Sequence, residues 1–141
     1  MRTIYLVEDD EGIRDVLEII LQDEHYKVKS FADVKKFKSR DILIIPDLFI
    51  FDVSLPDGSG IDLCNEIKKH SANEVPVLMM SAHANYTALK SDCSPDAFIS
   101  KPFEIDNFIN KIRSILHWFL FLSLRDLHFR YDKMNYADLI T

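Results

Sequence analysis

The chain has 141 residues, of which 48% are apolar, so it is long enough for one domain with a buried core and is not a disordered chain. Its net charge of -6 and pI near 5.3 argue against a broad nucleic-acid-binding face, because phosphate contacts require clustered Lys and Arg. The start, MRTIYLVEDD, reaches three acids after an apolar run too short for a signal-peptide core. We therefore expect a cytoplasmic protein with no membrane or nucleic-acid partner.

The apolar pattern alternates between strands and helices from the N-terminus onward. Residues 3–7 form a short apolar run, and residues 13–21 repeat apolar side chains at the spacing of one helix face. Residues 26–31 alternate apolar and polar side chains like an edge strand, and a weak helical pattern covers residues 32–40. The first half of the chain therefore predicts strand, helix, strand and helix.

The second half continues the alternation. Apolar runs over residues 48–51 and 75–80 predict buried strands, with a helix over residues 61–70 between them. Residues 97–99 predict a short last strand, and residues 105–116 have the clearest helical stripe. Strands that are apolar on both faces indicate a parallel sheet covered by helices on both sides, which is an α/β fold.

Two cysteines, Cys64 and Cys93, have neither the CxxC spacing of a redox or zinc site nor the density of a disulfide framework. We expect both to be ordinary small apolar residues of the core.

Polar residues follow the expected strands where each strand ends. They are Glu8, Asp9 and Asp10 after the first strand, Asp52 after the third, Ser81 after the fourth and Lys101 after the last. In such a sheet, ligands bind beyond the carboxyl ends of the strands. Clustered carboxylates repel by about 1 to 4 kcal/mol per pair, which a divalent cation relieves, and oxygen ligands suit Mg²⁺. Lys101 and the Ser81 hydroxyl can then neutralise and hydrogen-bond an added phosphoryl group.

Four motifs together resemble one family. They are VEDD at Val7 to Asp10, FDVSLPDGSG at Phe51 to Gly60, MMSA at Met79 to Ala82 and ISKPF at Ile99 to Phe103. In this order they are similar to the receiver domain of bacterial two-component response regulators, over about Met1 to Leu116. The resemblance implies a flavodoxin-like, doubly wound, five-stranded parallel sheet in the order 2-1-3-4-5 with five helices.

The resemblance also implies the role of each site residue. Asp52 would accept a phosphoryl group from a sensor histidine kinase or phosphotransfer protein. Glu8, Asp9, Asp52 and the backbone carbonyl of Ser54 would hold Mg²⁺. Ser81 would be the switch hydroxyl, Lys101 the phosphate-pairing lysine and Phe98 the aromatic switch residue. Phosphorylation would draw the Ser81 hydroxyl inward and let the Phe98 ring turn in from an outward rotamer, changing the helix 4/strand 5/helix 5 face that a downstream protein contacts.

Other residues of these motifs have plainer interpretations. Asp10 is expected to cap the first helix, and Asp57 and Gly58 to serve the turn after the third strand. The Lys101-Pro102 bond resembles the family's cis peptide and would aim Lys101 at the site. His83 lies where family members tune phosphoaspartate hydrolysis, but an exposed histidine without a role is an equal alternative.

The sequence departs from the family pattern in two places. The segment from Ser81 to Lys101 is about two residues shorter than usual, so we expect the fourth helix to be short or irregular. Ser54 is an unusual residue two positions past the phosphoacceptor, which leaves the lifetime of the phosphorylated state open.

We interpret residues 1–117 as a receiver domain and residues 118–141 as a C-terminal tail. The preferred function is a single-domain receiver, a phosphoacceptor switch rather than an enzyme. One alternative is a fragment of a longer response regulator without its output domain. Another is a small Mg²⁺-dependent phosphatase or phosphotransferase, although Ser54 stands where a DxD nucleophile motif has its second Asp. A flavodoxin-like cofactor binder is disfavoured, since the chain has three glycines and no Gly-rich phosphate loop.

The tail begins with an uncharged run that is too short to span a bilayer. Phe119 and Leu122 continue the core-facing stripe of the last helix, whereas Trp118 and Phe121 point elsewhere. We expect the last helix to continue to about Leu124 and its aromatic residues to bury against a second copy of the chain or another protein. A frayed end or the start of a linker is the alternative.

Overall fold

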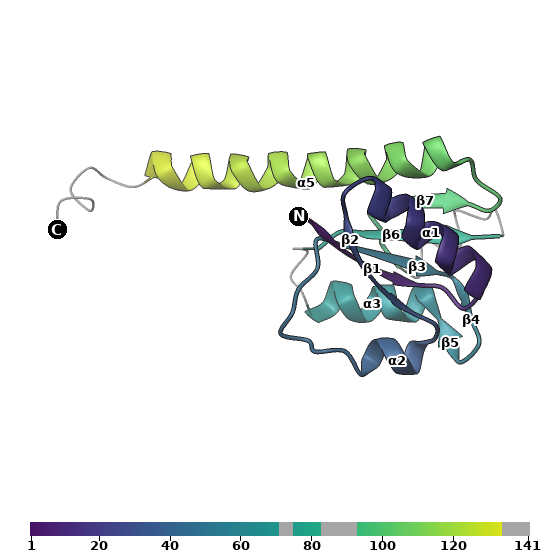
Figure 1. Cartoon of the computed structure of the whole chain (residues 1–141). Coiled ribbons are helices and arrows are strands. Elements are labelled where there is room, and N and C mark those ends of the chain that lie inside the picture. Colours follow the sequence, from purple (N-terminus) through teal and green to yellow (C-terminus); the bar gives the residue numbers. More distant parts are fainter. Residues whose placement is uncertain (71–74, 83–92, 134–141) are drawn as a thin grey trace.

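Five parallel strands form the central sheet of the computed structural model, which describes residues 1–70, 75–82 and 93–133 (Figure 1). The strands are β1 (Thr3–Val7), β2 (Lys27–Phe31), β3 (Leu48–Asp52), β6 (Val77–Ser81) and β7 (Ala97–Ser100). They lie in the order β2-β1-β3-β6-β7, and every neighbouring pair is parallel. This confirms the doubly wound sheet that the sequence predicts.

Helices cover both faces of the sheet. The described residues contain α1 (Glu11–Asp23), α2 (Val34–Lys38), α3 (Gly60–His70) and α5 (Ile105–Lys133). Figure 1 shows α1 and α5 on one face and α2 and α3 on the other. The second helix is shorter than the pattern over residues 32–40 predicts. The expected fourth helix and His83 lie outside the described residues.

The alternation of side chains along β3 divides the core into two apolar clusters. Phe49 and Phe51 point toward α2 and α3, where the ring of Phe37 packs edge-on against both of them. Leu48 and Ile50 point to the opposite face and join the cluster under α1 and α5. All five residues of β3 are buried, as expected for a strand in the middle of a covered parallel sheet.

Aspartates begin the first two helices. The Asp10 side chain accepts a hydrogen bond from the Ile13 N–H at 2.9 Å, which confirms Asp10 as the cap of α1. In the same way, Asp33 accepts from the Lys36 N–H at 2.7 Å and caps α2. These hydrogen bonds satisfy backbone donors that a helix start would otherwise leave unpaired.

A small antiparallel hairpin follows β3, formed by β4 (Ser54–Leu55) and β5 (Gly58–Ser59). Asp57 lies in its turn, as expected, but it also has a second role. Its carboxylate accepts hydrogen bonds from the N–H groups of Val34 at 2.9 Å and Lys35 at 3.0 Å. The bond from Val34 is the main cause of a lowered Asp57 pKa. Asp57 therefore joins the hairpin to the first turn of α2.

The structure corrects the prediction for the two cysteines. Cys64 of α3 and Cys93, which precedes β7, form a disulfide with Cα atoms 6.2 Å apart. Both residues are buried, as expected, but they meet because α3 packs on the sheet beside the segment that leads into β7. The two cysteines are 29 positions apart in the sequence, and that spacing did not predict the contact between them.

The last helix, α5, runs past Leu116 and the expected end near Leu124 to Lys133, and extends beyond the sheet (Figure 1). Phe119 packs against the core, whereas Trp118 and Phe121 are 58% and 51% exposed and stack on each other. The positions of these side chains confirm the prediction that Phe119 faces the core and that Trp118 and Phe121 do not. Among the described residues, none of the helices combines the length and the apolar character that a bilayer span requires.

Candidate functional site

The predicted site residues come together at the carboxyl edge of the sheet. Glu8 follows β1, Asp52 ends β3, Ser81 ends β6 and Lys101 follows β7. Because all of these strands are parallel, their ends lie at the same edge. The fold therefore places side chains that are far apart in sequence within hydrogen-bonding range.

Lys101 joins two of the carboxylates. Its Nζ donates to Oδ2 of Asp52 at 2.7 Å and to the two carboxylate oxygens of Glu8 at 3.0 and 3.2 Å. The bond from Lys101 to Pro102 is a cis peptide, as the resemblance implied. The Lys101 N–H donates to the Ser81 carbonyl at 2.7 Å, which fixes the start of this turn against the end of β6.

Burial shapes the charges of this cluster. Glu8 is 1% exposed and Asp52 6% exposed. Burial is the main cause that raises the pKa of Glu8 from 4.5 to about 7, and its hydrogen bond with Asp52 adds to the effect, while Lys101 opposes it. Burial by itself would lower the Lys101 pKa, but hydrogen bonds and charge from Asp52 and Glu8 outweigh it and raise that pKa. The ammonium thus stays charged between two acids.

Asp9 completes a group of carboxylates that has the character of a cation site. One oxygen each from Glu8, Asp9 and Asp52 lies within 4.8 Å of the others. Asp9 is exposed, so the group opens to solvent on that side. Lys101 balances only part of the negative charge, and a set of oxygen donors fits a hard divalent cation such as Mg²⁺. The residues present therefore fit a metal ion of this kind.

Two residues that the sequence analysis did not assign to the site, Arg14 and Gly60, contact the backbone of the acidic residues. Arg14 donates to the carbonyls of Glu8 at 2.9 Å and Asp9 at 3.3 Å. A side chain at Gly60 would bring its Cβ to 2.1 Å from the Asp52 carbonyl oxygen, so only glycine fits there. Arg14 and Gly60 are visible in the sequence, but it gives no signal for their contacts with the acidic residues, because these contacts depend on how α1 and α3 pack on the sheet.

Ser54 lies in β4, two residues after the phosphoacceptor candidate. Its N–H donates to Oδ1 of Asp52 at 3.2 Å, so the two oxygens of the Asp52 carboxylate have different partners. Ser54 itself is exposed. The loop after β3 thus orients the carboxylate while Lys101 binds its other oxygen.

Ser81 and Phe98 occupy neighbouring strands beside the acids. Ser81 is 2% exposed and directly follows Met80, which pairs with Asp52 across the sheet. Phe98 pairs with Met79 and is 6% exposed, packed in the apolar cluster under α2 and α3. The Phe98 ring is therefore turned inward in this structure, which differs from the outward rotamer expected before phosphorylation.

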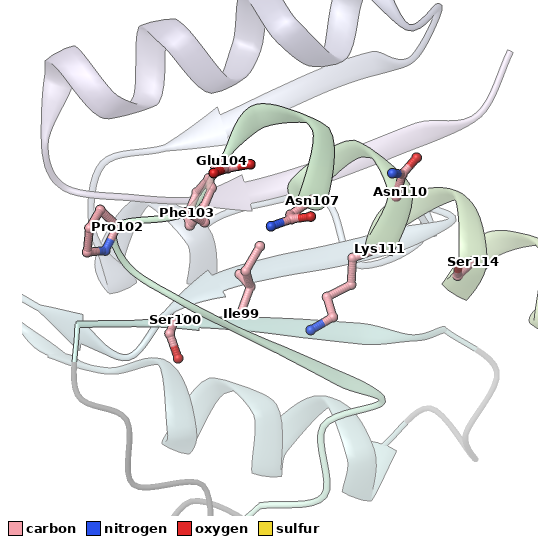
Figure 2. A pocket seen from close by; sticks show the side chains of 9 residues that line it. All are labelled: Ile99, Ser100, Pro102, Phe103, Glu104, Asn107, Asn110, Lys111 and Ser114. Carbon is pink, nitrogen blue, oxygen red and sulfur yellow. The ribbon is translucent and has the colours of Figure 1, made fainter.

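A surface groove runs along α5 beside the edge strand β7. Its first part is a pocket of about 610 Å³ that includes Asn107, Lys111 and Ser114 of α5 and Ser100 of β7 (Figure 2). A second pocket of about 410 Å³ shares Lys111 and Ser114 and continues to apolar residues, among them Trp118. The groove therefore has both polar and apolar lining residues near the carboxyl edge of the sheet and is more apolar toward the far end of α5.

Lys111 connects this groove to β7, the strand that carries Phe98. In Figure 2 its side chain reaches from α5 toward β7, where Nζ donates to the backbone carbonyl of Phe98. The position of Phe98 in the strand is thus coupled to a side chain that lines the groove.

The chain thus has a flavodoxin-like fold, a doubly wound sheet with buried carboxylates and a lysine at its carboxyl edge. Comparison with known families identifies it further: the model of the response regulator receiver domain matches residues 4–113. The chain belongs to this family, the receivers of two-component signalling.

Several known proteins are similar to the chain. The transcriptional regulatory protein CreB of Escherichia coli is 33% identical over 117 residues, which are 81% of this chain and 50% of CreB. A CheY-like receiver domain protein of Methanospirillum hungatei is 26% identical with a TM-score of 0.77 and covers 84% of this chain and 96% of its own. The response regulator TrrA of Thermotoga maritima, solved with Mg²⁺-BeF, has 24% identity, a TM-score of 0.72 and coverages of 81% and 98%, a similarity of fold.

The chain spans about half the length of the curated relatives it matches. For the response regulator ArlR of Staphylococcus epidermidis, which is 27% identical, the matched part is 82% of this chain and 53% of ArlR. These relatives therefore carry a further part to which the matched region does not extend.

Proposed function

We propose that Asp52 accepts a phosphoryl group from a sensor histidine kinase or phosphotransfer protein, and that this modification switches a protein-binding surface. The observation that carries the proposal is the Lys101 ammonium 2.7 Å from Asp52 and 3.0 Å from Glu8, in a buried acidic cluster. Asp52 is oriented by the Ser54 N–H, and a carboxylate oxygen of exposed Asp9 lies within 4.8 Å of one of its oxygens. This arrangement supports attack by a carboxylate oxygen on phosphorus.

Glu8, Asp9, Asp52 and the Ser54 backbone carbonyl would hold Mg²⁺ in this proposal. The bound ion supplies positive charge that neutralises phosphoryl oxygens and the acids around them. Lys101 then transfers its hydrogen bond from the Asp52 carboxylate to a phosphoryl oxygen. Support comes from the three-carboxylate group within 4.8 Å and from TrrA, a protein of the same fold that has been solved with Mg²⁺-BeF.

Ser81 and Phe98 would convert the added phosphate into a change of surface. The Ser81 hydroxyl, buried at the end of β6 next to Asp52, would donate to the phosphoryl group through a charge-assisted hydrogen bond. That bond would favour the inward Phe98 ring seen here over an outward one. Through the hydrogen bond of Lys111 to the Phe98 carbonyl, the groove beside α5 would respond to the same change.

The groove along α5 is the proposed contact for the downstream protein. Its first part offers the polar side chains of Asn107 and Lys111 near β7, and its second, more apolar part continues toward Trp118. It belongs to the helix 4/strand 5/helix 5 face of the predicted receiver. A cytoplasmic location suits a kinase-dependent switch.

We also propose self-association through the far end of α5. Around Phe121, apolar residues lie on all sides of the helix, and a helix that is apolar all round is normally buried. Trp118, Leu120, Phe121 and Leu124 are about half exposed in the single chain. A second copy packed against this part of α5 would cover them.

The main rival is a phosphatase or phosphotransferase that releases product repeatedly. Ser54 in the position of a second nucleophile-motif acid, together with the lysine already bound to Asp52, favours a phosphoacceptor over such an enzyme. We therefore propose that the protein is not a turnover enzyme, apart from self-dephosphorylation. A receiver that belongs to a longer regulator would use the same chemistry.

A labelling experiment with acetyl phosphate separates the two functions. The chain is incubated with acetyl phosphate and Mg²⁺, and both the intact mass and the released inorganic phosphate are followed. A switch gains one phosphoryl group, located at Asp52 by peptide mapping, and releases phosphate only as slowly as that group is lost. Fast, sustained phosphate release from a phosphomonoester such as para-nitrophenyl phosphate would instead establish the enzyme.

A further inference from the structure

The Cys64–Cys93 disulfide joins α3, which begins beside Asp52, to the segment that leads into β7. Cys64 lies in α3, and the first residue of α3, Gly60, packs directly against the Asp52 carbonyl oxygen. Cys93 lies just before β7, the strand that carries Phe98. The bond therefore links the backbone next to the phosphoacceptor to the strand of the switch aromatic.

The disulfide and the switch aromatic share one packed cluster. Cys64, Cys93 and Phe98 are 0%, 4% and 6% exposed, and all three belong to the apolar cluster that also contains Met79. Protein interiors are packed closely enough that a change of about one methyl group is felt by the neighbours. A change at the two sulfur atoms can therefore be transmitted to the Phe98 ring through the packing of this shared cluster.

A second link between the same two segments does not depend on the sulfur atoms. Nζ of Lys68, in α3, lies 2.5 Å from Oδ2 of Asp96, and the same oxygen accepts the Val77 N–H at 2.8 Å. These contacts hold the segment before β7 against α3 and the start of β6. With them in place, reduced Cys64 and Cys93 remain close, so the bond can form again after it has been broken.

We propose that Cys64 and Cys93 are a reversible redox pair, whose disulfide stabilises the inward position of Phe98 and thereby favours the phosphorylated form of the receiver. The inference rests on the proposed function, since it gives the redox bond an effect on the Asp52 switch. The disulfide acts as a brace between α3 and the entry to β7. In the reduced chain the ion pair of Lys68 with Asp96 is left to hold these segments.

The chemistry requires an oxidant of the hydroperoxide class. One thiol loses its proton and the thiolate attacks an oxygen of hydrogen peroxide; the O–O bond breaks to give a sulfenic acid and a hydroxide, which takes up that proton and becomes water. The second thiol then attacks the sulfenic sulfur, the S–S bond forms and a second water leaves. Two electrons pass from sulfur to the peroxide. A small dithiol reverses the reaction by thiol–disulfide exchange and is itself oxidised to a disulfide.

The test compares the two redox forms of the full chain. One sample is treated with hydrogen peroxide and then catalase, the other with dithiothreitol, and free thiols are counted by alkylation and intact mass. Each form is then titrated with beryllofluoride at saturating Mg²⁺, and binding is followed through amide NMR signals. We expect Cys64 and Cys93 to be protected from alkylation after peroxide, and the oxidised form to bind about fivefold more tightly, a coupling at the lower end of the usual range.

The Cys64→Ala and Cys93→Ala variants are the matched controls, and both should bind beryllofluoride equally after peroxide and after dithiothreitol. A redox effect that persists in these variants would come from other residues and would overturn the inference. Free thiols after peroxide, or equal beryllofluoride binding by the oxidised and reduced parent, would overturn the redox inference. Neither result would contradict the proposed function. Binding by neither form would overturn the proposed function as well. If a variant does not fold, the two forms of the parent still decide.

Discussion

Lys101 and Asp52 lie 2.7 Å apart although 49 residues separate them in sequence, and Lys101 also contacts Glu8. The same ammonium thus pairs with two buried acids in the unmodified protein and balances part of their negative charge. A phosphoryl group on Asp52 offers it new negative oxygens, so the ion pair can pass to the modified residue without leaving a buried charge unpaired. This relationship makes the acidic cluster stable before phosphorylation and receptive to it.

The first prediction concerns the phosphoacceptor. Asp52→Asn should abolish labelling by acetyl phosphate, because the amide lacks a carboxylate oxygen able to attack phosphorus. Asp62→Asn is the control, since Asp62 is an exposed acid of α3. Its variant should be labelled like the parent. EDTA should stop labelling in both the parent and the control, and labelling of the Asp52 variant at the parental rate would contradict the assignment.

The second prediction separates the lysine from the metal ligands. Lys101→Met removes the positive charge beside Asp52 and Glu8 but keeps much of the side-chain volume. Mg²⁺ should bind at least as tightly as in the parent, because the carboxylates lose a competing cation. Labelling by acetyl phosphate should fall by about 100-fold, the usual effect of losing one group that stabilises developing charge.

Isothermal titration with Mg²⁺ and the initial rate of labelling measure these two effects separately. Lys111→Met is the matched control, because Lys111 contacts the Phe98 carbonyl rather than the acids. Weaker Mg²⁺ binding by the Lys101 variant would show that the lysine organises the acids instead of competing with the ion.

The sequence patterns were sufficient for the strands and for the residues that gather at the carboxyl edge of the sheet, whereas the strand order came from the resemblance to receiver domains. Strands and edge residues follow from local patterns, since apolar runs locate the strands and the residue after each run must lie at the strand end. Local patterns could not predict which side chain or backbone group each side chain contacts. The contact of Asp57 with Val34 and the bond of Cys64 to Cys93 join segments whose relative position depends on helix packing, and local spacing carries no record of them.

The third prediction concerns the switch hydroxyl. Ser81→Ala should keep labelling of Asp52 but reduce the response of Phe98, because the phosphoryl group loses its hydrogen-bond donor on β6. NMR of the parent and the variant, with and without beryllofluoride and Mg²⁺, measures the response around Phe98. Ser81→Thr restores a hydroxyl and should recover at least part of it. Equal shifts in the Ala variant and the parent would count against this mechanism.

The fourth prediction follows from the hydrogen bonds of Asp57 to α2. The Val34 N–H is the main cause that lowers the Asp57 pKa below the 3.8 of an unfolded chain. A depressed carboxyl pKa stabilises the fold above the unfolded value, and this contribution is lost as the pH falls through the folded value. Asp57→Asn should therefore be less stable than the parent at neutral pH, with a difference that shrinks below pH 3.8.

Urea unfolding of the parent and the Asp57→Asn variant over a range of pH tests this sign. Asp15→Asn, an exposed position on α1, is the control for the loss of one negative charge. A stability difference for the Asp57 variant that grows as the pH falls would refute the stabilising role of the hydrogen bonds from α2 to Asp57.

The last prediction concerns the far end of α5. Trp118 and Phe121 stack on each other while remaining more than half exposed, and Phe119 on the neighbouring side packs against the core. Two copies that pair along this part of α5 would remove the stacked rings from water, which stabilises association through apolar burial. The full chain should therefore form a dimer in light scattering, and a chain ending at His117 should be a monomer. Trp118→Ala combined with Phe121→Ala should shift the full chain toward monomer, whereas Ser123→Ala, an exposed change on the same helix, should not. If the full chain and the shortened chain are both monomers with the same free energy of unfolding, the aromatic end of α5 has no role in self-association.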